Sequence, residues 1–169
     1  MKMDLKQPCK DCPFKNDLSY QRGWLGKERA EGIINDLYEL DLSFPCHKTT
    51  DGDMDEQHCA GAMILMERTE RANQRMRIAE RLNVYDRNKL KMDGPVFDTP
   101  EQFISWHAGS EVVTEYQLRK ARAEAKEIEK PAEDIPTELD AKKQAWRERK
   151  NEQLKGFIND LKAKGLPDE

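Results

Sequence analysis

Apolar residues recur at helical spacing along several stretches of this chain, and turn-forming residues separate those stretches. The spacing of Ile33, Leu37 and Leu40 predicts a helix over residues 27–40. A later apolar series, in steps of seven, four and three residues, predicts one long helix over residues 59–82. The first half of the chain is therefore expected to hold two helices joined by loops.

Helix-start signals mark further helices in the second half of the chain. Thr99 precedes Pro100 and stands three residues before Gln102, a capping-box pattern with proline at the first helical position. Gly109 is expected to end this short helix, and the residues that follow predict another helix over 111–129.

An acidic segment with two prolines, residues 131–137, precedes the last predicted helix, residues 138–164. The apolar positions of that helix form one stripe opposite charged residues, and they are Leu139, Trp146, Leu154, Phe157, Ile158 and Leu161. We therefore expect two parts, a domain over residues 1–109 and a helical hairpin extension over residues 110–169.

Composition limits the class of protein. Of the 169 residues, 37% are hydrophobic and 37% are charged, against about 45–50% and about 25% in typical soluble domains. The core must therefore be modest. The net charge of −4 argues against nonspecific nucleic-acid binding by the whole molecule. No apolar run suits a membrane span or a signal peptide, so a cytoplasmic protein is expected.

All four cysteines, Cys9, Cys12, Cys46 and Cys59, lie in the first 59 residues. They stand beside prolines and a glycine at the ends of predicted elements, rather than on apolar stripes. A two-residue spacing brings two sulfurs to one centre, and two further cysteines can complete a tetrahedron around a metal. Disulfides and free thiols are the alternatives. The pattern favours a metal centre that staples a small, mainly α domain with short extended segments.

Zinc and an iron–sulfur (4Fe–4S) cluster both accept four cysteine ligands. Zinc is the first expectation because it is common and suits a fold with little core. The wide separation of Cys46 from Cys59 and the proline directly after Cys12 are typical of several cluster proteins, which keeps the cluster as an alternative. His47 and His58 adjoin expected ligands and could support them by hydrogen bonds or replace one.

Three short segments, residues 9–15, residues 44–49 and Cys59-Ala60-Gly61, resemble a set of uncharacterised phage and prophage proteins. In that set a CxxCP start is followed by a Cys-His pair and then by a helix that opens with Cys-Ala-Gly. The resemblance covers about residues 7–108. It implies a metal-binding phage protein made in a bacterial cytoplasm, and it brings no established activity.

Two features suggest a surface for a partner. Arg68, Arg71 and Arg75 share one face of the predicted long helix, where they could grip phosphates or form an ordinary solvated face. Trp146 stands among basic residues of the last helix, where it suits either a partner surface or packing within the hairpin.

A closed set of four ligands leaves no open position for catalysis. The leading hypothesis is therefore a noncatalytic protein that engages a bacterial host protein or nucleic acid through the basic helix or the C-terminal helices. An iron–sulfur redox or nucleic-acid-processing enzyme is the alternative, although no residue is assigned a catalytic role. The stripe of the last helix also allows two copies to associate.

Overall fold

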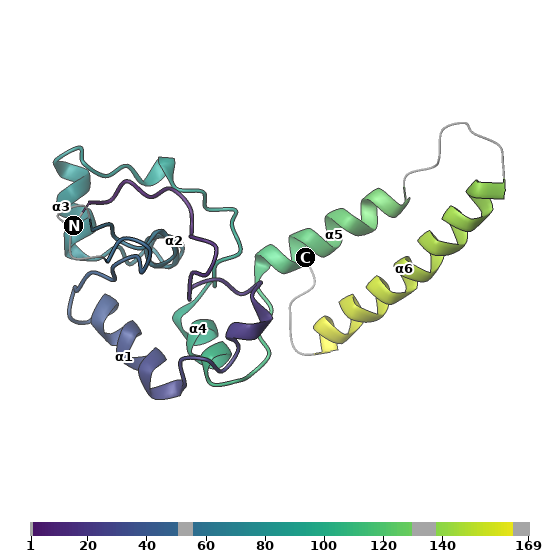
Figure 1. Cartoon of the computed structure of the whole chain (residues 1–169), viewed down its shortest axis with the longest axis horizontal. Helices are drawn as coiled ribbons and strands as arrows, with labels where there is room; N and C mark the ends of the chain where they lie inside the picture. Colours follow the sequence, from purple (N-terminus) through teal and green to yellow (C-terminus); the bar gives the residue numbers. More distant parts are fainter. Residues whose placement is uncertain (1, 51–55, 130–137, 164–169) are drawn as a thin grey trace. The chain divides into compact units, whose positions relative to one another are not determined.

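Short helices joined by long irregular segments form the protein in the computed structural model, which describes residues 2–50, 56–129 and 138–163. Within these ranges no residue belongs to an extended strand, and the β-type pairs are isolated bridges: Lys2 with Gln57, Lys15 with Val96, and Pro45 with His58. The predicted mainly α fold class is confirmed. The chain divides into two compact units, Met1–Thr114 and Glu115–Glu169 (Figure 1).

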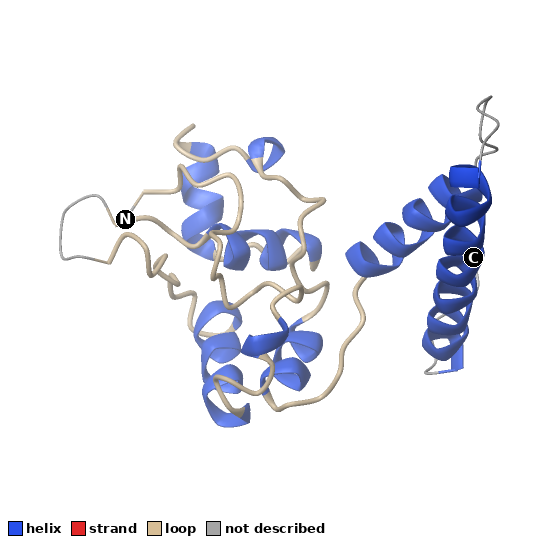
Figure 2. Ribbon diagram, turned by 45° about the vertical axis from the view of Figure 1, so that its right-hand side comes forward, coloured by secondary structure: helices blue, strands red, loops and turns tan. Residues whose placement is uncertain are grey.

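The first unit, hereafter unit 1, holds four α-helices and two short 3₁₀ helices within its described residues. In chain order these are η1 (Ser19–Gln21), α1 (Lys27–Tyr38), α2 (Ala60–Arg68), α3 (Gln74–Arg81), η2 (Arg87–Lys89) and α4 (Pro100–His107). Loops and turns make up much of the rest, as the tan segments of Figure 2 show. Helices α1 and α4 pack against each other. Both were predicted from the sequence, and Thr99 caps α4 by accepting a hydrogen bond from the amide of Gln102.

Helix α2 is the centre of the unit 1 core. Every residue from Ala60 to Glu67 is buried, because a helix that is apolar on all sides must be enclosed by the rest of its domain. Aromatic side chains surround it: the ring of Phe14 stacks on Phe103 at 4.8 Å and meets the edge of Phe44 at 5.1 Å. The segment that carries the first cysteines therefore lies within the core.

The prediction of one long helix over residues 59–82 is wrong, because the chain turns between α2 and α3. The hydroxyl of Thr69 donates to backbone carbonyls at the end of α2, and Glu70 adopts a left-handed conformation with φ of 54°. Asn73 then caps α3 by accepting a hydrogen bond from the amide of Met76. The apolar spacing continues across this turn, so spacing alone did not reveal it.

The second unit, hereafter unit 2, consists of α5 (Glu115–Glu129) and α6 (Glu138–Ala163), which pack against each other (Figure 1). Helix α5 begins four residues later than expected because unit 1 binds the preceding backbone. The side-chain amide of Gln102 donates to the carbonyl of Val113 at 3.3 Å, and that of Asn16 donates to the hydroxyl of Thr114. The predicted acidic linker over residues 131–137 lies outside the described residues.

Burial in unit 2 follows the predicted stripe of α6 only in part. Leu161 is buried, and Leu154 and Ile158 are half-buried, whereas Trp146 and Phe157 are exposed. Unit 2 therefore has a narrow apolar contact between its helices. No helix in the described ranges combines the length and apolarity that crossing a membrane requires.

Candidate metal centre

Two backbone features bring the four cysteines of unit 1 together. The first is the turn from Cys9 to Cys12, in which the amide of Cys12 donates to the carbonyl of Cys9 at 3.3 Å. The second is the bridge between Pro45 and His58. There the amide of Cys46 donates to the carbonyl of Gln57, and that of Cys59 to the carbonyl of Phe44, both at 2.8 Å. Each feature thus contributes two cysteines.

The thiols of the two features are in contact. The sulfur atoms of Cys12 and Cys59 lie 3.5 Å apart. The thiol of Cys9 is hydrogen-bonded to Cys12 and also interacts with Cys46. Cys12, Cys46 and Cys59 are buried, and Cys9 is half-buried. Residues separated by as many as 50 positions in the sequence, from Cys9 to Cys59, therefore belong to one sulfur cluster.

The four thiols of the sulfur cluster differ in pKa: two have a lowered pKa and two have a raised one. The pKa of Cys9 is lowered to about 6, chiefly by a hydrogen bond from Cys12 and also by the nearby His47, although partial burial acts in the opposite direction. A hydrogen bond from Cys12 also lowers the pKa of Cys59. The pKa of Cys12 is raised well above its usual value, because it donates to Cys59 and Cys9 and is buried. Burial raises the pKa of Cys46.

Cys59 is the N-cap residue of α2, and its sulfur faces the first amides of the helix. The side chain makes no regular capping hydrogen bond. The amides of Ala62 and Gly61 nevertheless help to lower the pKa of the thiol, because the start of a helix stabilises negative charge. The close approach of this turn requires glycine at position 61. A Cβ atom there would lie 2.5 Å from the sulfur of Cys12 and 2.9 Å from the Cβ of Phe14.

The cysteines suit a metal ion in donor type and proximity, but they contact one another in pairs. A tetrahedral ion with sulfur ligands at about 2.3 Å separates those sulfurs by about 3.8 Å, close to the 3.5 Å between Cys12 and Cys59. In the part of the chain that the structure describes, no group of three or more His, Cys, Asp or Glu residues surrounds a common point as a metal site would. Holding an ion would therefore require the thiols to turn toward one centre.

The two histidines next to cysteines differ in their surroundings. The Nδ1 atom of His47 lies 3.9 Å from the sulfur of Cys9, at the partly exposed edge of the sulfur cluster. His58 is completely buried, neither ring nitrogen has a hydrogen-bond partner, and burial lowers its pKa to about 4. His47 is thus the histidine that the structure places against a cysteine sulfur.

A third histidine holds the cysteine turn against the core. The Nε2 atom of His107, on α4, lies 2.9 Å from the carbonyl of Pro13, the residue after Cys12, and its ring packs on Phe103 at 4.6 Å. His107 is completely buried, so it forms part of the core. The direct bond to Pro13 was missed, because no sequence pattern connects residues 94 positions apart.

The expected basic face is not formed, because the turn after α2 separates its three arginines. Arg68 is used within unit 1: its side chain is 11% exposed, pairs with Asp98 at 3.0 Å, and donates to the carbonyls of Val96 and Met92. Arg68 thus has its partners within unit 1, and its role as a phosphate-binding residue stays a prediction. A half-buried guanidinium that donates to several carbonyls fixes a loop to the end of α2.

The other predicted surface residues stay exposed. Arg71 lies over the ring of Tyr38 and pairs with Glu39 at 3.2 Å. Arg75 donates from Nε to the carbonyl of Asp41 at 3.3 Å. Trp146, in unit 2, is 58% exposed, with the amine of Lys150 lying 5.0 Å from its ring centre.

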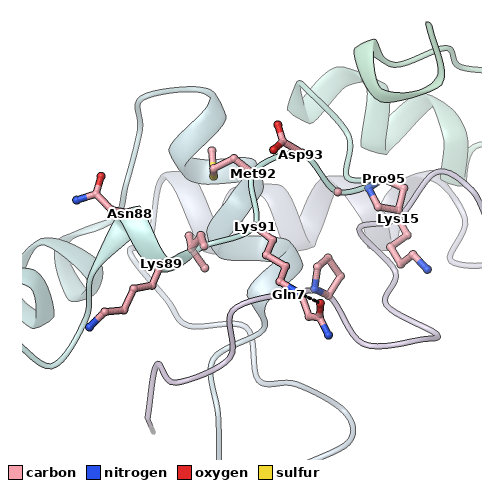
Figure 3. A pocket seen from close by; sticks show the side chains of 11 residues that line it. Gln7, Lys15, Asn88, Lys89, Lys91, Met92, Asp93 and Pro95 are labelled. Atoms are coloured by element: carbon pink, nitrogen blue, oxygen red, sulfur yellow. Dashed lines mark hydrogen bonds between the residues drawn. The ribbon is translucent and has the colours of Figure 1, made fainter. Parts of the chain in front are cut away.

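A hollow of about 640 Å³ in unit 1 is lined by lysines from distant parts of the chain (Figure 3). The amine of Lys91 donates to the side chain of Gln7 at 2.8 Å, as the dashed line in Figure 3 shows. Lys15 pairs with Asp17 at 3.2 Å, and Lys89 pairs with Asp86 at 3.5 Å. These partners compensate much of the positive charge, so the hollow makes a weak case for a phosphate site.

Comparisons with known proteins give no relative for this chain. No family model, no curated protein and no solved structure matches it significantly. The geometry described above is therefore the basis for assigning a function.

Proposed function

We propose that unit 1 is a noncatalytic binding module stapled by one metal ion, which Cys9, Cys12, Cys46 and Cys59 would hold. The observation that carries this proposal is the proximity of these thiols, with the sulfurs of Cys12 and Cys59 3.5 Å apart and the Cys9 thiol interacting with Cys12 and Cys46, in a domain with short helices and long loops. In such a domain, the loops are not held in place by the regular backbone hydrogen bonds of helices or sheets. An ion bound by both cysteine-bearing features would cross-link them and add folding free energy of about 10 kcal/mol.

The surroundings of the sulfurs favour a structural role over catalysis. Four thiolates fill the coordination shell of a tetrahedral ion, whereas catalytic zinc keeps one position for water or substrate. Cys12 and Cys59, at 0% and 3% exposure, leave little access for a substrate. Burial of this kind also protects the ligands from oxidation and exchange.

Zinc is the proposed ion. A single ion draws its ligands to within about 3.8 Å of one another, which agrees with the 3.5 Å between the sulfurs of Cys12 and Cys59. In an iron–sulfur cluster each cysteine binds a different iron atom, so the ligand sulfurs are held further apart. The cluster, and with it a redox or nucleic-acid-processing enzyme, is therefore the less favoured alternative.

A protein is the proposed partner, in preference to nucleic acid. The chain carries a net charge of −4, and Arg68 is bound internally. Neither observation favours a polyanion as the partner. The likeness of the cysteine segments to phage proteins is the reason for proposing a bacterial host protein in the bacterial cytoplasm as that partner.

Metal analysis of anaerobically purified protein tests the proposal. We expect a colourless protein with one zinc per chain, and Cys12→Ser and Cys46→Ser variants that lose zinc. Ala30→Ser is the matched control, because it places the same hydroxyl at a fully buried position of α1 that carries no sulfur. It should keep its zinc. A folded, metal-free protein with four reactive thiols would refute the proposal, and a brown iron-containing protein would favour the cluster alternative.

A further inference from the structure

A second hollow of unit 1, of about 600 Å³, has a different character from the lysine-lined one. We call it the aromatic groove. Its apolar walls come from η1, from α1 with the loop before it, and from the segment that precedes Cys46, and they include Tyr20, Trp24, Leu25, Ile33 and Phe44. Its edge also includes Asp11 and Pro13 from the first cysteine turn, and His47. The groove thus lies beside the candidate metal centre.

Two aromatic side chains at the groove are exposed to an unusual degree. Tyr20 is 66% exposed and Trp24 is 62% exposed. Exposed aromatic residues beside an apolar hollow are typical of protein-binding sites, because a partner side chain gains burial there that the free protein lacks. The groove is therefore suited to a large apolar side chain.

Among the described residues, the charges that line the groove leave the cation of Arg29 without a charged partner. Asp11 pairs with Lys48 at 3.1 Å and accepts a hydrogen bond from Tyr20 at 3.2 Å, so its charge is already balanced. Arg29 is exposed on α1 and has no hydrogen bond or ion pair within the described part of the chain. An arginine in this situation is complementary to a carboxylate.

A buried amide in the groove wall has an unused acceptor. Gln21 is 3% exposed, and its Nε2 atom donates to the carbonyl of Asp11 at 3.0 Å. This bond fixes the amide orientation, because a flipped side chain would set two oxygens against each other. The Oε1 atom has no partner. The bond to Asp11 ties η1 to the first cysteine turn and so fixes this part of the groove wall.

We infer that the aromatic groove binds a peptide segment of a partner protein in which a large apolar side chain stands beside a carboxylate. The apolar side chain packs on Trp24, and the carboxylate pairs with Arg29. The inference rests on the proposed function, because the cysteine turns supply one edge of the groove. A basic peptide lacks the carboxylate.

The test is a selection of random dodecapeptides, displayed on yeast, against the full-length protein with its metal bound. We expect enrichment of peptides with Leu, Ile, Phe or Trp within two positions of Asp or Glu. Synthetic copies of an enriched peptide should bind Trp24→Ala about tenfold more weakly, as measured by fluorescence anisotropy. Arg29→Glu should shift the enriched peptides from acidic to basic residues.

Two exposed residues outside the groove lining provide matched controls. Arg22→Glu makes the same charge change close to Arg29 in sequence, and Leu82→Ala removes an apolar side chain that is 67% exposed. Both variants should select the same peptides as the unmodified protein. An enriched pool without the motif, or one that Arg29→Glu leaves unchanged, would overturn the inference.

Metal content measured on the same samples separates the two proposals. A protein that holds zinc but selects no motif contradicts the peptide inference alone. A protein that selects the motif without holding metal supports the peptide inference and contradicts the metal-stapled module. Circular dichroism of Trp24→Ala verifies that any loss of binding does not reflect unfolding. Arg29→Glu changes an exposed position, so it tests the groove even if Trp24→Ala does not fold.

Discussion

Helices α2 and α6 represent two different ways of stabilising a helix in this molecule. In α2 every residue from Ala60 to Glu67 is buried, and the helix is surrounded by segments from both ends of unit 1. In α6, which runs for 26 residues, Leu161 is the one buried side chain among those described. The first helix depends on its surroundings, whereas the second depends mainly on its own backbone bonds and one narrow contact.

This difference has consequences for how each unit responds to change. A short helix such as α2, with nine residues, is not stable in isolation, so loss of the contacts around it should unfold unit 1 as a whole. A long, charged helix with a partner along one side loses little when a single exposed residue changes. Perturbations of the sulfur cluster should therefore have larger effects than perturbations of α6.

Metal removal is expected to produce the largest effect. Stripping the ion with a strong chelator should unfold unit 1, because binding contributes about 10 kcal/mol of folding free energy. Unit 2 has no cysteine and should keep its helical signal. Thermal unfolding of the full chain, followed by circular dichroism, should change from two transitions to one. Two unchanged transitions after complete metal removal would contradict this prediction.

The Gly61→Ala substitution should have the next largest effect. Its Cβ would overlap the sulfur of Cys12 and the side chain of Phe14, so we expect a loss of about 3 kcal/mol in the stability of unit 1 together with weaker metal binding. Chemical unfolding and a zinc competition assay would measure the two quantities.

Two other helical glycines are controls for that substitution, one in each unit. A Cβ at Gly32 in α1 or at Gly156 in α6 would meet nothing within 4 Å. Each alanine variant should be more stable than the unmodified protein by about 0.5–1 kcal/mol, because alanine loses less backbone entropy than glycine when a helix forms. A stabilising Gly61→Ala would show that the packing around the Cys12 sulfur is looser than described.

Within unit 2, the burial of the substituted side chain should determine how much stability is lost, and the losses should be smaller than those in unit 1. Leu161→Ala removes the buried contact of α6 and should cost about 2 kcal/mol of unit 2 stability. Trp146→Ala should cost less than about 0.5 kcal/mol, since the ring is 58% exposed. The unit 2 transition in thermal unfolding gives both values. Equal losses would indicate that Trp146 packs against a second copy or another surface.

The smallest expected effect is a change in pH dependence from His107. Burial lowers the pKa of His107 in the folded state. Between that pKa and the unfolded value of about 6.5, the unfolded chain binds more protons, so stability falls as the pH falls. His107→Gln keeps an N–H donor for the carbonyl of Pro13 but does not titrate. Its stability should fall less steeply from pH 7 to pH 5 than that of the unmodified protein.

Acid also weakens metal binding by protonating the thiolates. The unmodified protein and the His107→Gln variant share that contribution. The difference between their curves of stability against pH therefore measures the contribution of His107 alone. Identical curves would show that His107 does not titrate in this range.

The helices predicted from local signals were located accurately. The start of α4 at Pro100 was evident from Thr99, and α1 and α6 follow apolar spacing. The turn between α2 and α3 was missed, although Asn73 is a strong N-cap residue, because the apolar spacing continued through it. The start of α5 was misplaced because long-range bonds from Asn16 and Gln102 hold the preceding backbone.

Local sequence patterns did not predict which side chains of unit 1 are exposed. Arg68 has the sequence context of a solvated helix residue, yet it is enclosed by a loop some 25–30 positions later. Tyr20 and Trp24 gave no periodic signal, although an aromatic residue between two glycines, Gly23-Trp24-Leu25-Gly26, is a hint of exposure. Their grouping with Phe44 arises only when the two parts of the chain meet.

The sequence by itself determined the helical class, most helix positions and the kind of atom available for a metal, since these depend on spacing and side-chain chemistry within a few residues. Only the tertiary structure decided that Cys12 and Cys59 lie 3.5 Å apart, that Arg68 pairs with Asp98 and that an aromatic groove adjoins the cysteine turns. The physical reason is that such contacts depend on the packing of α2 against distant loops, which leaves no periodic trace in the order of residues.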